Sequence, residues 1–354
     1  MLDDPAAIAE VDPTDFLRTV EGLPAQLEDA VGLARSVEGL PSTDGLRSIA
    51  VLGMGGSGIS GEVCRAVLAP LAPVPVATIR DYDLPRWVGP DTLTFAVSYS
   101  GNTEETLGAF EQAVERRARI VAVTTGGRLA EEAAARGYPV VRVPGGLMPR
   151  AALGYVGIPP LVVSSRLGLA PGLEDALPEA LEVVGNRVAE CRRDVPAWAN
   201  PAKQLAGRLA GRLPLVWGTE GISGAAAYRW KCQLNENAKV VAACAAFPEL
   251  NHNEVVGLYG SGTDPAPGPR VGLVVLRHAG EHPRTARRID VTTSLVSDSV
   301  AFVEEVWARG SSPLARLLDL VAAGDLTTTY LGIVRGVDPA PIVAIDKLKA
   351  ALGG

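Results

Sequence analysis

The sequence is poor in the residue types that mark disulfide-stabilised, zinc-binding and nucleic-acid-binding proteins. Among 354 residues there are four cysteines and three histidines, and no two cysteines are spaced as C-x-x-C. Reduced thiols in a cytoplasmic protein are therefore the simplest interpretation. The net charge of −7 argues against a nucleic acid or an anionic membrane surface as partner. It leaves room for a small anionic substrate, which needs only a local pocket of donors.

The sequence also lacks an apolar run of the length that a bilayer requires. Its most apolar window, residues 151–163, is short and is interrupted by two glycines and two consecutive prolines. The first eleven residues are acidic and lack the apolar core of a signal peptide. We therefore expect no transmembrane segment. The length allows two domains of ordinary size, and a content of 47% hydrophobic and 21% charged residues is typical of globular proteins.

Short apolar segments alternate with amphipathic segments along most of the chain. The first segments, at residues 48–52 and 92–97, are apolar nearly throughout, as in strands that are buried on both faces. Such alternation predicts an α/β fold with doubly wound parallel sheets. The pattern restarts near residue 200, which predicts a second domain of the same kind. The expected parts are a helical arm at 1–40, a first domain at 41–170, a connector helix at 171–199 and a second domain at 200–354.

A glycine-rich stretch follows the first expected strand and opens a helix. Such a loop presents backbone N–H groups and a helix start to an anion. Gly53, Gly55 and Gly58 satisfy the pattern G-x-G-x-x-G, and Asp81 or Asp83 lies at about the distance that a dinucleotide-binding fold requires. This loop alone leaves a dinucleotide site open.

The loop S-Y-S-G-N-T after the next strand favours a phosphate monoester instead. Ser98, Ser100 and Thr103 bring three hydroxyl groups to a helix start, and Ser57 can supply a fourth from the neighbouring loop. Ordinary N-capping by Asn102 or Thr103 accounts for one of these residues and leaves the others unexplained.

A second polar cluster, residues 232–257, has the groups that proton transfer needs. Glu236 and His252 are each flanked by asparagines, and the apolar segment 240–247, which we expect to be buried, separates them. A carboxylate and an imidazole can form a proton-shuttling pair, and asparagine suits the support of such groups. A helix end followed by a polar turn explains the same residue types equally well.

The string N-E-N-A-K followed by P-E-L-N-H-N-E resembles the signature of bifunctional phosphoglucose/phosphomannose isomerases, which are sugar isomerase (SIS) domain proteins. S-Y-S-G-N-T-E-E-T is likewise similar to the phosphate loop of SIS domains. The resemblance covers nearly the whole chain and implies two SIS-type domains, each a three-layer αβα sandwich. It implies a cytoplasmic aldose–ketose isomerase that interconverts glucose 6-phosphate, mannose 6-phosphate or both with fructose 6-phosphate. The implied mechanism is a metal-free cis-enediol route without a cofactor.

The resemblance also implies a role for each residue that matches a family motif. Glu236 would move the proton between C2 and C1, His252 would open the sugar ring, and Arg150, in the context P-R-A-A-L-G-Y, would stabilise the enediolate. Lys347 or Lys349 would be the active-site lysine of a C-terminal helix. Family members are commonly homodimers whose catalytic histidine comes from the partner subunit, so we expect the same of His252. The implied phosphate-binding residues are Gly56, Ser57, Ser98, Ser100 and Thr103.

Other interpretations of the sequence are weaker. A non-catalytic sugar-phosphate sensor would keep the loop 98–103 but would not need Glu236 and His252 together. An amidotransferase-type synthase would require a glutaminase domain with an N-terminal cysteine, which this sequence does not contain. His278 and His282 form H-x-x-x-H, but Gly280 between them and the lack of a third ligand nearby argue against a metal site.

Overall fold

The computed structural model describes residues 1–260 and 270–352. The chain forms two compact units, called here the first and the second unit. The first unit consists of Gly22–Gly185 and Arg309–Asp319, and the second of Met1–Glu21, Asn186–Ala308 and the chain from Leu320 onward. The arm expected at residues 1–40 is divided between them. The second unit holds α1 (Pro5–Val11) and α2 (Phe16–Glu21), and the first unit holds α3 (Leu23–Ser36).

The first unit contains one sheet of five parallel strands. In chain order the strands are β1 (Ser48–Leu52), β2 (Val76–Ile79), β3 (Thr92–Val97), β4 (Arg119–Thr124) and β5 (Val140–Arg142). They are arranged in the order β2-β1-β3-β4-β5, and all neighbours are parallel. The order reverses between β1 and β3, and ligands of such folds bind at this point, outside the carboxyl ends of the strands.

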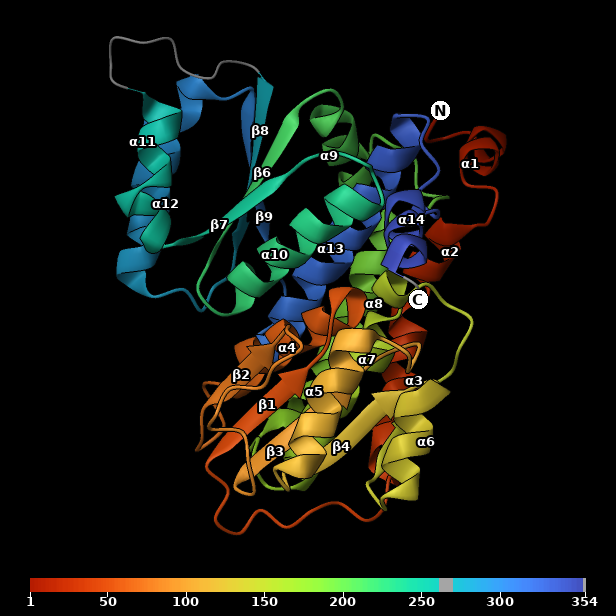
Figure 1. Cartoon of the computed structure of the whole chain (residues 1–354). Helices are drawn as coiled ribbons and strands as arrows, with labels where there is room; N and C mark the ends of the chain where they lie inside the picture. The colour runs from red at the N-terminus through yellow and green to blue at the C-terminus, as the bar shows by residue number, and fades with distance from the viewer. Residues whose placement is uncertain (261–269, 353–354) are drawn as a thin grey trace. The chain divides into compact units, whose positions relative to one another are not determined.

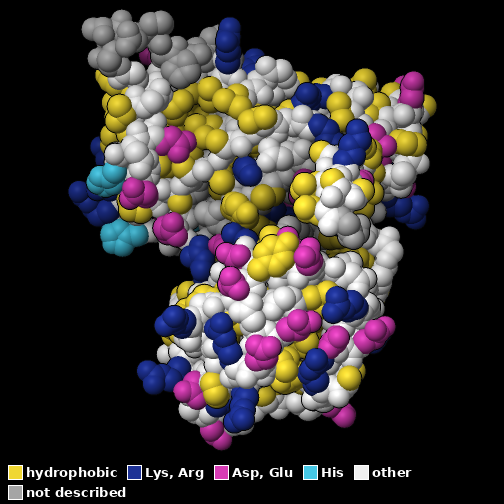
Figure 2. All heavy atoms as spheres, viewed as in Figure 1, with side chains coloured by type: hydrophobic (Ala, Val, Ile, Leu, Met, Phe, Trp, Pro, Cys, Tyr) yellow, Lys and Arg dark blue, Asp and Glu magenta, His cyan; other side chains and the backbone are white. Residues whose placement is uncertain are grey.

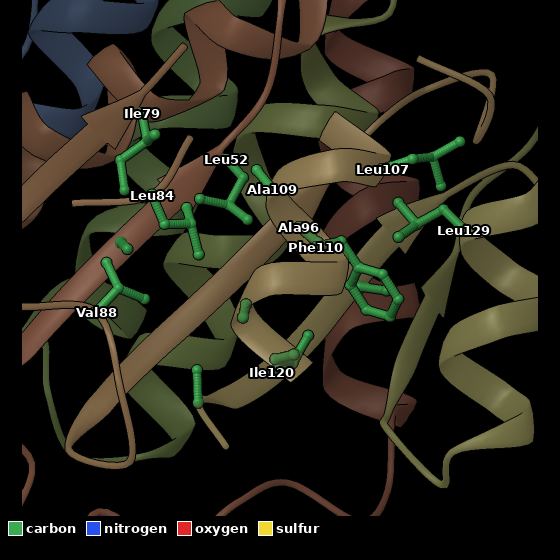
Figure 3. Close-up of a cluster of buried hydrophobic side chains, with 14 of the residues drawn as sticks. Leu52, Ile79, Leu84, Val88, Ala96, Leu107, Ala109, Phe110, Ile120 and Leu129 are labelled. Atoms are coloured by element: carbon green, nitrogen blue, oxygen red, sulfur yellow. The ribbon is translucent and has the colours of Figure 1, made fainter. Parts of the chain in front are cut away.

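Helices cover both faces of the first sheet (Figure 1). On one face, Leu107 and Phe110 of α5 pack against Leu52, Ala96 and Ile120 of the strands (Figure 3). Helix α4 packs against α7 on the other face. Since the central strands β1, β3 and β4 are buried along nearly their whole length, the sheet fixes the positions of the loops at its ends. The helical elements of the first unit are α3, α4 (Gly55–Leu68), α5 (Glu104–Glu115), α6 (Gly127–Ala135), η1 (Pro149–Ala151), α7 (Leu153–Arg166) and the start of α8 (Leu173–Cys191).

The second unit contains four parallel strands in the order β7-β6-β8-β9. Trp217 and Leu273 face Phe247 and Ile289 in a core beneath α11 and α12. On the other face, Trp230 of α10 donates a hydrogen bond to the Leu320 carbonyl of α13 at 2.8 Å. Both units are thus parallel α/β sandwiches, as predicted (Figure 1).

The strands of the second unit are β6 (Leu213–Thr219), β7 (Ala243–Phe247), β8 (Val271–Arg277) and β9 (Phe302–Trp307). Its helical elements are α9 (Pro201–Leu209), α10 (Ile222–Glu236), η2 (Glu249–His252), α11 (Glu254–Tyr259), α12 (Pro283–Val296), η4 (Ser297–Ser299), α13 (Pro313–Val334, which begins in the first unit) and α14 (Val343–Leu352).

The prediction that residues 240–247 are buried is wrong for most of that segment. Only Ala242 and Phe247 are buried, and Val241 is 79% exposed. The segment leads into β7, which is the edge strand of its sheet. An edge strand has no neighbour on one side, so a continuous apolar run there does not guarantee burial.

The expectation that no apolar run is long enough for a bilayer is wrong for helix α13, which could cross a membrane by length and composition alone. However, 94% of its most apolar 18-residue window is buried inside the protein. Its Asp325 forms a buried ion pair with Arg229 of α10, with an Oδ2–Nη2 distance of 2.6 Å. This packing is that of a central core helix.

Candidate active site

The two loops at the centre of the first sheet are joined to each other. The loop after β1 carries Ser57 in the first turn of α4, and the loop after β3 carries Ser98–Thr103. The backbone N–H of Tyr99 donates to Ser57 Oγ at 3.0 Å. The hydroxyl of Ser57 and the hydroxyl-rich loop therefore belong to one cluster at the carboxyl edge of β1 and β3.

Within the second of these loops, the hydroxyl groups do not serve as helix caps. Ser98 Oγ and Thr103 Oγ1 lie 2.9 Å apart, and Ser98 Oγ accepts a hydrogen bond from Gly101 N at 3.1 Å. Thr103 is at the N-cap of α5, yet its side chain makes no capping bond to that helix, whose residues the structure describes throughout. Ser100 is exposed, and its Oγ accepts from Asn102 N at 3.3 Å. Capping thus does not explain the three hydroxyl groups.

The shape of the loop is fixed by Gly101 and Asn102. Gly101 has a φ of +72°, and a Cβ there would lie 1.8 Å from the Gly126 carbonyl oxygen, so only glycine fits. Asn102 Oδ1 accepts a hydrogen bond from Arg128 N at the start of α6. The polar face of the loop is therefore rigidly presented at the start of α5, where backbone N–H groups and the helix dipole favour an anion.

Arg150 is buried at this edge, with 3% of its surface exposed, and it is not a surface arginine beside a helix. It lies in the 3-10 turn η1, whose backbone contacts the glycine loop. A Cβ on Gly56 would lie 2.6 Å from Pro149 C and 2.7 Å from Arg150 N, so the two loops meet backbone to backbone. Thus Gly56 and Arg150, like Ser57 and the loop 98–103, belong to one edge of the first unit.

Tyr99 ties the same edge to the loop that leads to Arg150. Its hydroxyl donates to the Pro144 carbonyl at 2.9 Å and accepts from Leu147 N at 3.1 Å. Burial raises the pKa of the Tyr99 phenol, so the group stays protonated and able to donate. The first unit thus forms a preorganised polar edge suited to an anion, called here the anion-binding edge.

Glu236 is the last residue of α10 in the second unit and lines a pocket of about 870 Å³. Asparagines fix the main chain on either side of it. Asn235 Nδ2 donates to the Val240 carbonyl at 2.7 Å, and the buried Asn237 donates to Thr328 Oγ1 of α13 at 3.1 Å. The pocket is lined by Lys231, Asn235, Glu236, Lys239, Val240, Val241, Ala242, Val337, Asp338, Pro341, Ile342, Val343, Ala344 and Ile345.

His252 is exposed in η2 and does not belong to the described residues that line the Glu236 pocket. Its turn is nevertheless anchored, because Asn251 Nδ2 donates to the buried Thr292 Oγ1 of α12 at 2.7 Å. Asn253 caps α11 by accepting from Glu254 N at 2.6 Å. The structure therefore holds the histidine turn firmly but does not bring Glu236 and His252 of one chain into one pocket.

The candidate lysines of the C-terminal helix also lie outside the described lining of this pocket. Lys347 and Lys349 are exposed on α14, and only the start of that helix, residues 343–345, faces the pocket. Two other lysines, Lys231 and Lys239, line it instead. The sequence did carry a signal for Lys239, since it closes the string N-E-N-A-K three residues after Glu236.

Neither metal nor thiol chemistry has a clear site in the part of the chain that the structure describes. There, no group of three or more histidine, cysteine, aspartate or glutamate side chains is arranged to hold a metal ion. His278 Nδ1 accepts from Gly280 N, and His282 Nδ1 caps α12 by accepting from Arg284 N, both at 3.2 Å. All four cysteines are free, and burial raises the pKa of Cys64, Cys232 and Cys244.

Comparison with known proteins connects these two polar regions to one family. The model of the SIS domain matches residues 46–137, and the model of the "Bacterial phospho-glucose isomerase C-terminal SIS domain" matches residues 198–352. The chain is 38% identical to the bifunctional phosphoglucose/phosphomannose isomerase of Caldicellulosiruptor bescii, over 95% of this chain and 98% of that protein. The chain belongs to the bifunctional phosphoglucose/phosphomannose isomerase family. It is a sugar-phosphate isomerase.

Further members and structures agree with this assignment. The family member from Thermoplasma acidophilum is 37% identical over 85% of this chain and 88% of its own length. The C-terminal domain of glucosamine-fructose-6-phosphate aminotransferase from Francisella tularensis superimposes with a TM-score of 0.72, covering 91% of this chain and 97% of that chain. At 12% identity this likeness establishes the fold alone. The resemblance inferred from the sequence is confirmed, while the roles of individual residues stay predictions.

Proposed function

We propose that this isomerase converts glucose 6-phosphate, mannose 6-phosphate or both into fructose 6-phosphate through a cis-enediol, with Glu236 as the base. The observation that carries the proposal is the position of Glu236 at the anchored end of α10, in a pocket that also contains lysines. A sugar C2–H is weakly acidic, so its removal requires a carboxylate held in a fixed geometry. We propose a cytoplasmic location and a role in glycolysis and gluconeogenesis.

The anion-binding edge of the first unit supports recognition of the substrate phosphate. Ser57, Ser98, Ser100 and Thr103 supply hydroxyl donors, and Gly56 lets the backbone approach closely. Hydroxyl groups and helix N-termini bind a phosphate without a cationic patch, in keeping with the acidic net charge.

The proposed reaction uses only side chains. His252 gives a proton to the ring oxygen, and the C1–O5 bond breaks. The C1 hydroxyl returns a proton to the imidazole, which leaves the open chain with its C1 aldehyde. Glu236 then takes the proton from C2, and the electron pair moves to give the enediolate, whose charge Arg150 stabilises. A proton passes from the C2 hydroxyl to the C1 oxygen. As Glu236 returns the carbon-bound proton to C1, the carbonyl forms at C2 and gives fructose 6-phosphate. Electrostatic stabilisation of the kind assigned to Arg150 is typically worth a few kcal/mol of barrier.

A homodimer in which His252 enters the partner's Glu236 pocket is supported by the surface around the histidine. His252 is exposed and does not line the Glu236 pocket of its own chain among the described residues. Directly after it, Val256 and Tyr259 of α11 are 64% and 52% exposed. Hydrophobic side chains also lie at the surface over α14 (Figure 2), among them Val343 and Leu348. Exposed apolar side chains of this kind are typical of interaction surfaces.

The proposal is tested by a coupled assay for fructose 6-phosphate formation from glucose 6-phosphate and from mannose 6-phosphate, before and after exhaustive treatment with EDTA. We expect turnover of at least one hexose phosphate, unchanged by the chelator. Binding without turnover would identify a sugar-phosphate sensor. Activity that is lost with EDTA and restored by zinc would contradict the metal-free mechanism.

A further inference from the structure

Lys239 has a backbone conformation that lysine rarely adopts. In the turn that follows α10, Val240 N donates back to the Leu234 carbonyl at 3.2 Å, and Lys239 lies within this turn in the left-handed region. Its φ is +53°. Glycine is the usual residue here, because a side chain disfavours this region. A lysine at this position therefore suggests a function for its side chain.

The side chain of Lys239 joins two segments of the pocket wall. Its ammonium donates a hydrogen bond to the Glu236 carbonyl and another, at 3.0 Å, to the Pro339 carbonyl. Pro339 precedes the segment 341–345, which forms the wall shared with Glu236. One cation thus connects the main chain of the proposed base to the segment 337–345, whose residues on both sides of Pro339 line the same pocket.

Neighbouring groups hold the same turn but do not make that connection. Arg335 Nη1 donates to the Ala238 carbonyl at 3.1 Å, which satisfies a carbonyl beyond the helix end and complements the dipole. A Cβ on Gly332 would lie 2.7 Å from the Asn237 carbonyl oxygen, so α13 is packed directly against the turn. These contacts fix the turn on α13, whereas Lys239 reaches the segment after that helix.

We propose that Lys239 is a positioning residue for proton transfer, acting through Glu236 by fixing the separation between the Glu236 main chain and the Pro339–Ile345 wall. The inference rests on the proposed role of Glu236. Without the ammonium group, the Glu236 carboxylate should be misplaced relative to C1 and C2 of the sugar. Small misplacements of a catalytic group lower kcat strongly. Substrate phosphate affinity depends on the first-unit loops, so KM should change little.

The experiment compares Lys239→Met, which keeps the aliphatic stem, with Lys239→Gly, which suits the left-handed backbone. Lys203→Met is the matched control, because Lys203 Nζ also donates to two carbonyl groups, of Arg193 and Val195, but outside the pocket. We expect both Lys239 variants to lower kcat by about 10- to 100-fold per folded enzyme, with KM within about twofold of wild type. Lys203→Met should lower Tm and leave kcat unchanged. Lys239→Gly should melt at or above the temperature of Lys239→Met.

Three results would overturn the inference: wild-type kcat in Lys239→Met, a kcat loss no greater than that of Lys203→Met, or an effect confined to KM. If Lys239→Met fails to fold, Lys239→Gly decides by the same criteria. Glu236→Gln, measured alongside, separates the two proposals. An inactive Glu236→Gln with a fully active Lys239 variant rejects only the positioning role. A fully active Glu236→Gln rejects the proposed base itself.

Discussion

The two sheets reverse strand order at corresponding points, between β1 and β3 and between β6 and β8, but the edges there differ chemically. The β1/β3 edge carries glycines and hydroxyl groups at two helix starts. At the β6/β8 edge, Ser223 Oγ accepts from Thr219 N at 2.7 Å, and Glu281 accepts from His278 N and Arg277 Nε at 3.0 Å each. Glu305 Oε1 also accepts a hydrogen bond from Arg277 Nη1 at 2.7 Å.

The difference shows that one architecture can present chemically unlike edges. The β6/β8 edge satisfies its own donors and carries buried carboxylate charge, which disfavours a phosphate. The second unit instead contributes the anchored end of α10, with Glu236 at its tip. Under the proposed function, phosphate binding and proton transfer depend on different units, so KM and kcat should respond to different substitutions.

The largest expected effect comes from the second unit. Glu236→Gln keeps the size and hydrogen-bonding capacity of the side chain but cannot accept the C2 proton. We expect kcat to fall by about 10²-fold or more, in line with the usual contribution of a general base, while KM changes little. Steady-state kinetics with both hexose phosphates measure this. A rise in KM as large as the fall in kcat would mean that phosphate binding and proton transfer are not divided between the two units.

The next effect tests whether two chains share one site. His252→Ala and Glu236→Gln should each be nearly inactive alone. After mixing under conditions that exchange subunits, half of the dimers are mixed, and each mixed dimer has one intact site of two. About a quarter of wild-type activity should therefore return. A mixture as inactive as its components would show that His252 acts within its own chain or not at all.

A smaller effect is expected at the β1/β3 edge. Ser100→Ala removes an exposed hydroxyl from the proposed phosphate cradle and should raise KM by about tenfold, the usual magnitude for a hydrogen bond to a charged group. Ser223→Ala, at the corresponding edge of the second unit, is the matched control. It should lower Tm, because it breaks a buried hydrogen bond, and should leave KM unchanged. An unchanged KM in Ser100→Ala would remove that loop from the site.

The smallest effect concerns the stability of the first unit away from its binding edge. Glu179 on α8 accepts hydrogen bonds from Ser311 and Ser312, which lower its pKa from 4.5 to about 2. A lowered carboxyl pKa stabilises the fold above about pH 4.5, and this stabilisation is lost as the pH falls towards 2.

Glu179→Gln should therefore lower Tm at pH 7, with a difference from wild type that shrinks between pH 4.5 and 2. Thermal melts across this range measure it, with Glu182→Gln on the exposed face of the same helix as control. A Tm difference that is constant with pH would exclude the carboxylate as the source of stability.

The sequence predicted the central strands of this protein well. Strands such as 48–52 and 92–97 were identified because buried parallel strands read as unbroken apolar runs, and the loops that follow them could be located from that alone. The loop 98–103 was predicted to bind a phosphate because three hydroxyl groups at one helix start exceed what capping needs, and this role stays a prediction.

Other features depend on tertiary contacts that the sequence does not specify. The run 240–247 reads as buried, but its exposure follows from the edge position of β7. Lys347 and Lys349 are exposed because no residue of α14 is buried, and helical spacing alone does not show how little this helix packs against the rest of the chain. The role of Lys239 depends on a backbone angle and on a contact with Pro339, which lies 100 residues further along the chain.

The central claim is that Glu236 moves the proton between C2 and C1, and solvent exchange tests it most directly. In deuterated water, the wild-type enzyme should introduce deuterium at C1 of fructose 6-phosphate and at C2 of the recovered aldose phosphate, as followed by NMR. Glu236→Gln, with its binding edge intact, should bind the substrate and introduce almost none. Exchange by Glu236→Gln at the wild-type rate would contradict the claim and assign the base to another residue.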